Sequence, residues 1–256
     1  MTGFFYLDPH PAGTPGVLLL HGLGANGSSW GLQFAPLIQA GFRPLAPDAP
    51  GFGETSYDGR GWNFKRIAAD LAALIGELGL GPAHIVGISM GGVIALQFAL
   101  DYPGLVRKLA LVNTFAILRP AHWTGYLYFL QRLVMVNTVG LPTQARFVAK
   151  RIFPQPDQEP LRQILIEQVT KADPRAYRAA MLHLGLFNVV KRLDEIKAPT
   201  LVITAQNDTT VDPLRQKALV DGIAGARQIV IPGAGHAVSV DQPGLFNQAL
   251  MEFLLN

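Results

Sequence analysis

The chain has 256 residues, of which 49% are hydrophobic and 15% are charged, and its formal net charge is +3. This length and composition fit one α/β domain with a full core and exclude a disordered chain. There are no cysteines, which excludes a disulfide framework and a thiolate metal site.

The positive charge is concentrated in the middle of the chain, where residues 116–197 carry a net charge of +6 and the remainder carries −3. The basic residues there are scattered at helical spacings, which favours a solvated helical face over a nucleic-acid or lipid surface. The same charge is compatible with acidic substrates. The first residues lack the pattern of a signal peptide, and no segment reaches the roughly 20 apolar residues of a membrane span. We therefore expect a cytoplasmic protein without a nucleic-acid partner.

Strand-like and helix-like segments alternate, which predicts a mostly parallel sheet covered on both faces. Buried apolar runs predict strands over residues 17–20, 42–46, 85–88, 109–112, 200–204 and 228–231. Apolar residues at spacings of three and four predict a helix over residues 63–78, and further helices are expected over 92–100 and 245–255.

This rhythm breaks near Phe115, after the fourth strand of that series. Residues 116–193 carry helical patterns, no convincing strand, and prolines that divide them into about four helices. We expect this segment to be a helical cap over the carboxyl edge of the sheet. The predicted core therefore comprises residues 1–115 and 194–256.

The pentapeptide Gly87-Ile88-Ser89-Met90-Gly91 lies between a predicted strand and a predicted helix. A Gly-x-Ser-x-Gly sequence in that context predicts a nucleophile elbow, a sharp turn that exposes the serine hydroxyl. The flanking glycines remove side chains that would meet the strand and the helix. Ser89 is therefore the candidate nucleophile, although the motif alone also fits an ordinary glycine-rich turn.

A serine needs a base to take its proton, and His236 is the candidate. It follows the last predicted strand in a loop of small residues, whereas four other histidines fit less well (His10, His84, His122 and His183). The base in turn needs an acid that fixes its tautomer. Asp208 follows the strand ending at Thr204 and is favoured over Asp212, which precedes a proline and fits a helix N-cap equally well.

The negative oxygen of a tetrahedral intermediate needs hydrogen-bond donors. The backbone N–H of Met90 is one expected donor. The second is the N–H of Leu23, in the loop His21-Gly22-Leu23-Gly24 after the first predicted strand.

Four motifs in this order resemble the α/β-hydrolase superfamily, in its compact capped esterase, lactonase and C–C hydrolase branch. They are the His21–Gly24 loop, the Asp48–Ser56 loop, the serine elbow and the Asp208/His236 pair. The Asp48–Ser56 loop departs slightly from the family's D-x-x-G-x-G-x-S pattern, with Thr55 before Ser56 and Phe52 where histidine is common. The resemblance implies an α/β-hydrolase fold with a Ser-Asp-His triad of Ser89, Asp208 and His236.

A serine nucleophile forms an acyl-enzyme, so the sequence predicts a carboxylesterase-type hydrolase of short-to-medium acyl esters that needs no cofactor and no metal. An enol-lactonase, a C–C bond hydrolase and a perhydrolase are alternatives with the same triad, and a non-catalytic ligand receptor is the alternative outside enzymes. The expected partner is a small ester or lactone. An aromatic stretch of the cap is expected to line the substrate pocket or to pack against the core (Trp123, Tyr126 and Phe129).

Overall fold

The computed structural model describes residues 3–118 and 123–256, and its centre is one seven-stranded sheet. The strand order is β1-β3-β2-β4-β5-β6-β7; β1 is antiparallel to β3, and every other neighbouring pair is parallel. The strands are β1 (Tyr6–Leu7), β2 (Gly16–Leu20), β3 (Arg43–Pro47), β4 (Ala83–Ile88), β5 (Val106–Val112), β6 (Thr200–Ala205) and β7 (Arg227–Ile231). The α/β fold predicted from the sequence is confirmed.

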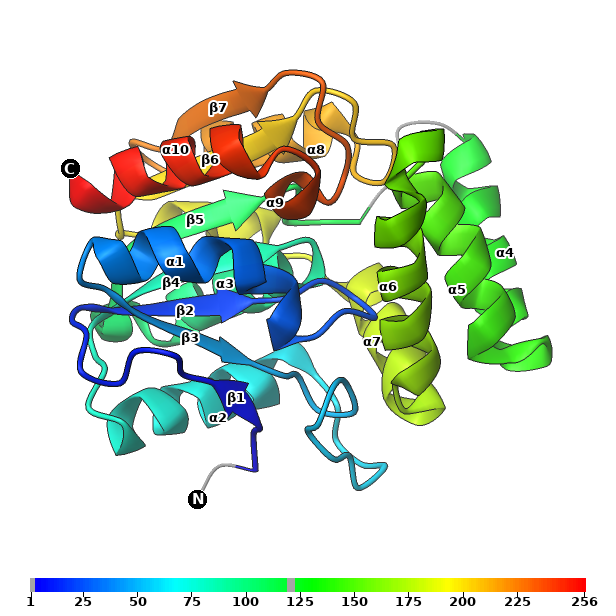
Figure 1. Ribbon diagram of the computed structural model, residues 1–256, viewed down its shortest axis with the longest axis horizontal. Helices are drawn as coiled ribbons and strands as arrows, with labels where there is room; N and C mark the ends of the chain where they lie inside the picture. Colours follow the sequence, from blue (N-terminus) through cyan, green and yellow to red (C-terminus); the bar gives the residue numbers. More distant parts are fainter. Residues whose placement is uncertain (1–2, 119–122) are drawn as a thin grey trace.

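Helices cover both faces of this sheet (Figure 1). On one face, α1 (Gly31–Gln39) and α10 (Pro243–Leu255) pack against side chains such as Leu19 and Val86. On the other face, α2 (Phe64–Glu77), α3 (Met90–Asp101) and α8 (Pro213–Gly222) pack against side chains such as Leu18 and Ile85. Because successive strand residues point to opposite faces, a strand covered on both sides is buried throughout and largely apolar, as β2 and β4 are.

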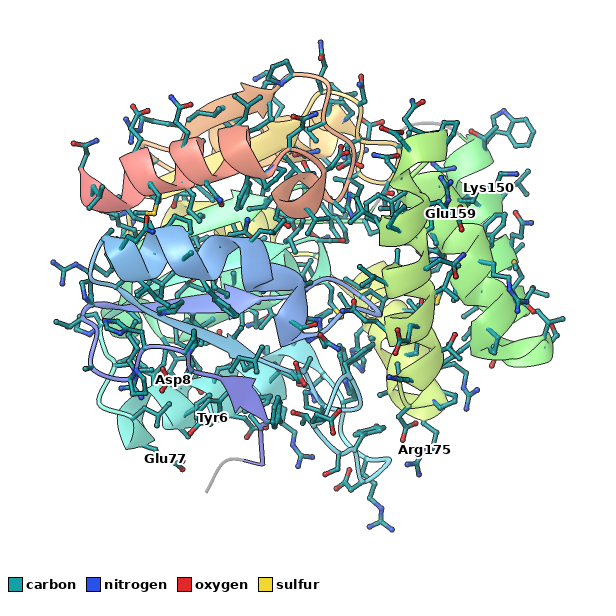
Figure 2. The ribbon with its side chains drawn as sticks, in the orientation of Figure 1. Tyr6, Asp8, Glu77, Lys150, Glu159 and Arg175 are labelled. Carbon is teal, nitrogen blue, oxygen red and sulfur yellow. The ribbon has the colours of Figure 1, made fainter. Side chains whose placement is uncertain are left out.

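Four α-helices follow β5 in the described part of residues 116–193, and they lie beside the carboxyl ends of the strands (Figure 1). They are α4 (Trp123–Thr138), α5 (Gly140–Ile152), α6 (Glu159–Lys171) and α7 (Pro174–Leu186). The short helix α9 (Val238–Asp241) precedes α10. Figure 2 shows Lys150 and Glu159 near the upper end of the layer that these helices form, and Arg175 near its lower end.

The two ends of the helical segment lie next to each other. Ile117 forms an antiparallel bridge with Asn188, and the Val189 N–H donates to the Ala116 carbonyl over 3.0 Å. The segment therefore leaves and rejoins the sheet at one point.

No helix in the described ranges is long and apolar enough to cross a membrane.

Candidate active site

Ser89 lies between β4 and α3 with a backbone conformation that non-glycine residues rarely adopt, φ 54° and ψ −114°. It is the N-cap residue of α3, yet its side chain makes no capping hydrogen bond. The glycines on either side are required by close packing: a Cβ on Gly87 would collide with the Gly91 carbonyl, and one on Gly91 would collide with the Leu20 carbonyl. The sequence therefore forces a tight turn with the serine hydroxyl at its tip.

Hydrogen bonds to the end of β5 hold this strained turn in place. The Ser89 N–H donates to the Val112 carbonyl over 2.9 Å, and the Thr114 hydroxyl donates to the Ser89 carbonyl over 2.7 Å. Both backbone polar groups of Ser89 are thus fixed, which supports a conformation that is unfavourable in isolation.

Asp208 and His236 form a direct hydrogen-bonded contact after the ends of β6 and β7. The His236 Nδ1 lies 3.0 Å from each carboxylate oxygen of Asp208, and the Asp208 side chain is fully buried. Asp208 Oδ1 also accepts the N–H groups of Thr210, over 2.7 Å, and of Val211, over 3.0 Å. Since a carboxylate only accepts, the proton of the neutral imidazole is on Nδ1, and Nε2 carries the free lone pair.

Asp212, the alternative acid, has a different role. It is the N-cap of α8, and its carboxylate accepts the Leu214 N–H over 2.8 Å. The structure therefore brings Asp208, and not Asp212, to His236.

Asn113 is a further residue of this site that the sequence did not point out. It is fully buried at the end of β5, with φ 42°. Its side-chain amide donates to the His236 carbonyl over 2.7 Å, and its side-chain oxygen accepts the Ala205 N–H over 2.8 Å. Asn113 thus joins the end of β6 to the loop that carries His236, directly beside the segment that holds Ser89.

The loop after β2 is fixed by His21, which is buried. Burial lowers the pKa of His21, so the ring is neutral. Its Nε2 accepts the Ala49 N–H over 2.9 Å, which leaves Nδ1 to donate to the Gly22 carbonyl over 2.8 Å. Asp48 also stabilises this loop, because its carboxylate accepts the Gly27 N–H over 2.6 Å and the Glu54 N–H over 2.8 Å.

The two expected oxyanion donors are located in these fixed segments. Leu23 follows the tied His21–Gly22 pair, and Met90 is the first residue of α3. Within residues 3–118 and 123–256, neither the Leu23 N–H nor the Met90 N–H donates to another backbone carbonyl. The positive end of the α3 helix dipole adds to the attraction for negative charge at this point.

Two cavities meet at Ser89. The first, about 530 Å³, is largely apolar and also contains His236; we call it the apolar cavity, and its walls include Leu32, Val148, Ile152, Leu161, Ile164 and Leu165. The second, about 520 Å³, is the arginine cavity, and its walls include Phe129, Met181, Leu184, Arg132, Arg151 and Arg215. Leu23, Ser89, Tyr128, Arg132 and Thr210 line both. Each volume lies within the range of small-molecule sites.

The predicted triad and pocket residues do not all meet in one place. Both Ser89 and His236 line the apolar cavity, but no hydrogen bond joins the Ser89 hydroxyl to the His236 ring within the described residues. Tyr126 and Phe129 line the arginine cavity. Trp123 is 72% exposed and lines neither cavity, which corrects its assignment to the pocket: it lies at the first position of α4, with its side chain in solvent. His122 lies outside the described residues.

Comparisons with known proteins agree with this architecture. The sequence model of a protein family described as "Alpha/beta hydrolase family" matches residues 17–249 of this chain. The chain is 32% identical over 254 residues to a candidate carbamate hydrolase, RutD, of Variovorax paradoxus, covering 95% of this chain and 93% of that one. It is 28% identical to the 2-hydroxy-6-oxo-6-phenylhexa-2,4-dienoate hydrolase of Burkholderia cepacia, covering 94% and 87%. Among solved structures, a thermophilic esterase from Thermogutta terrifontis, with malate bound, superimposes with a TM-score of 0.84 at 28% identity, covering 98% and 92%.

Proposed function

The chain belongs to the alpha/beta hydrolase family, and within it we propose that it is a serine hydrolase that cleaves carboxylic esters of short-to-medium acyl chains through an acyl-enzyme. One observation carries the proposal. A serine with an unused hydroxyl, at a strained strand–helix turn, shares a cavity with a histidine whose Nδ1 is held by a buried carboxylate. That combination provides a nucleophile, a base and the group that orients the base.

In the proposed reaction, His236 Nε2 takes the proton of Ser89 as the serine oxygen attacks the ester carbonyl. The carbonyl oxygen becomes negative and accepts hydrogen bonds from the N–H groups of Leu23 and Met90. The protonated His236, stabilised by Asp208, then gives its proton to the departing alcohol. Water repeats the sequence on the acyl-enzyme, which releases the acid and restores Ser89.

The helices after β5 supply the walls that select the substrate in this proposal. Residues 116–193 act as a cap, because α4 and α5 contribute side chains to both cavities at Ser89, α6 contributes to the apolar cavity and α7 to the arginine cavity. The apolar cavity suits an acyl chain, since each buried methylene contributes about 0.8 kcal/mol while it still fits.

A second candidate is the hydrolysis of a carbamate, favoured by the relative named a candidate carbamate hydrolase at 32% identity. The same triad applies, with a carbamoyl-enzyme as the intermediate. Cleavage of a C–C bond is a third candidate, because the relative from Burkholderia cepacia is named for such a substrate.

The deciding experiment combines labelling with a substrate panel. A fluorophosphonate probe should modify Ser89, and the site of labelling is read by peptide mass spectrometry. 4-Nitrophenyl esters from C2 to C12 are then compared with lactones, aryl carbamates and a C–C hydrolase substrate. Labelling without turnover of any of them would favour a ligand receptor, and turnover that survives Ser89→Ala would refute the mechanism.

A further inference from the structure

Three arginines line the cavity on one side of Ser89. Arg132 comes from α4, Arg151 from α5, and Arg215 from α8. Apolar side chains share the lining and include Phe115, Leu118, Met181 and Leu184. Three positive charges from separate elements therefore line one cavity.

Arg132 is the best placed of the three, because it lines both cavities and so stands beside the space next to Ser89. One of its terminal nitrogens donates to the Tyr177 hydroxyl over 2.9 Å, and its guanidinium lies 5.7 Å from the centre of the Tyr128 ring. Its Nε is buried and has no hydrogen-bond partner. The side chain is thus held by neutral groups, with donor capacity left over.

Among the described residues, no acidic side chain forms an ion pair with Arg132, Arg151 or Arg215. The two carboxylates in the same cavity are already engaged, Asp208 with His236 and Asp212 with the start of α8. Arg215 also has a buried Nε without a partner.

A partly buried cation without a counter-charge is costly unless a ligand supplies the missing charge. We infer that Arg132 binds a carboxylate carried by the substrate, and that the enzyme prefers esters with a free carboxylate elsewhere in the molecule. A carboxylate matches the planar fork of guanidinium donors. The apolar side chains of the same lining suit a monoanion better than a dianionic phosphate, which demands more donors. This inference rests on the proposed ester hydrolysis at Ser89.

The test compares each anionic ester with its neutral methyl-capped counterpart. One pair places the carboxylate on the acyl side, as in mono-4-nitrophenyl esters of C5 to C8 dicarboxylic acids, with spontaneous hydrolysis subtracted. The other places it on the leaving group, as in 4-acetoxybenzoate. The measured quantity is the ratio of kcat/KM for the anionic ester to that for the capped one.

Wild-type enzyme should favour the anionic member of at least one pair. Arg132→Gln should lower that ratio by about 10- to 100-fold, the value of a hydrogen bond between charged groups. Arg132→Lys, which keeps the charge and loses the fork, should give an intermediate ratio. The matched control is Arg146→Gln, because Arg146 is exposed on α5 and lines neither cavity; its ratio should equal the wild-type ratio.

A binding measurement separates this inference from the proposed function. Glutarate should bind to Ser89→Ala protein in calorimetry, and adding Arg132→Gln should weaken it by a similar factor. Binding that depends on Arg132, without any ester turnover, would leave the carboxylate site intact and reject the reaction. Ser89-dependent turnover with equal ratios in wild type and Arg132→Gln would reject the carboxylate site alone, as would Arg132-dependent binding of inorganic phosphate without binding of glutarate. Thermal denaturation checks that each variant folds. If Arg132→Gln does not fold, the comparison of wild type with Arg132→Lys tests the inference instead.

Discussion

Replacing Asp208 with asparagine tests the role of the acid most sharply, because the surrounding hydrogen bonds fix which way the new amide must face. Oδ1 of Asp208 accepts two backbone N–H groups, from Thr210 and Val211. The oxygen of an asparagine must remain there, or two buried donors would lose their acceptor. Its NH₂ group then takes the position of Oδ2, 3.0 Å from His236 Nδ1, beside the amide oxygen, which lies at the same distance but is already engaged by the two backbone N–H groups.

An amide N–H at that place donates to Nδ1, which moves the ring proton to Nε2 and removes the lone pair that Ser89 needs. We expect Asp208→Asn to lower kcat by about 10³- to 10⁴-fold, as for a triad left in the wrong tautomer. The assay is 4-nitrophenyl ester hydrolysis, with the tautomer of His236 read by ¹⁵N NMR. Asp212→Asn is the contrast: asparagine is as good an N-cap as aspartate, so its effect should be far smaller. The opposite ranking of the two variants would refute the reasoning.

The remaining predictions concern other parts of the molecule. Ser89→Ala should remain folded and lose about 10⁴- to 10⁶-fold in kcat, as checked by ester turnover alongside circular dichroism; wild-type turnover by the folded variant would sink the assignment. Ile152→Ala enlarges the apolar cavity, which holds the acyl chain in the proposed reaction, and should shift the preferred acyl length, whereas Trp123→Ala should keep the wild-type profile across C2 to C12 esters. Asn113→Ala leaves the Ala205 N–H unpaired, so urea denaturation should show a loss of about 1–3 kcal/mol and kcat should fall with it; an unchanged kcat would contradict its role in placing His236. Burial lowers the pKa of His84 to about 4, with Lys108 and Arg107 acting in the same direction, so the unfolded state binds the proton first as the pH falls below about 6.5. The unfolding free energy should therefore decrease between about pH 6.5 and pH 4, and that decrease should be smaller in His84→Asn. An equal dependence of the unfolding free energy on pH in the two proteins would contradict this role of His84.

The sequence predicted the central strands and the helices α2, α3 and α10 because their apolar patterns are local. It missed α1, where Pro36 lies inside the helix and Gly31 begins it, so that the segment reads as a turn. It also missed β1, whose two residues carry no pattern of their own and are recruited only by pairing with β3.

The candidate site divides in the same way. Ser89, Asp208 and His236 stand in motifs with a fixed order along the chain, so they could be predicted. Asn113 and Arg132 could not, because their roles depend on contacts with distant segments: Asn113 acts through residues 92 and 123 positions away. For Arg132, the local signals are its place in an otherwise apolar stretch of α4 and its share of the positive charge of residues 116–197, and neither shows what the side chain contacts.

The point where the helical segment leaves and rejoins the sheet has a consequence for how related enzymes can acquire new substrates. Ala116 and Ile117 are bonded to Val189 and Asn188, so some 70 residues are attached to the sheet as a hairpin loop would be. An insertion whose ends are already side by side imposes little strain on its host when it is exchanged. The parts of both cavity walls that α4 to α7 contribute could be replaced as one block while the Ser89 turn, the Asn113 link and the Asp208–His236 pair keep their places. A chimaera joined at the Ile117–Asn188 bridge should therefore fold with a new substrate range.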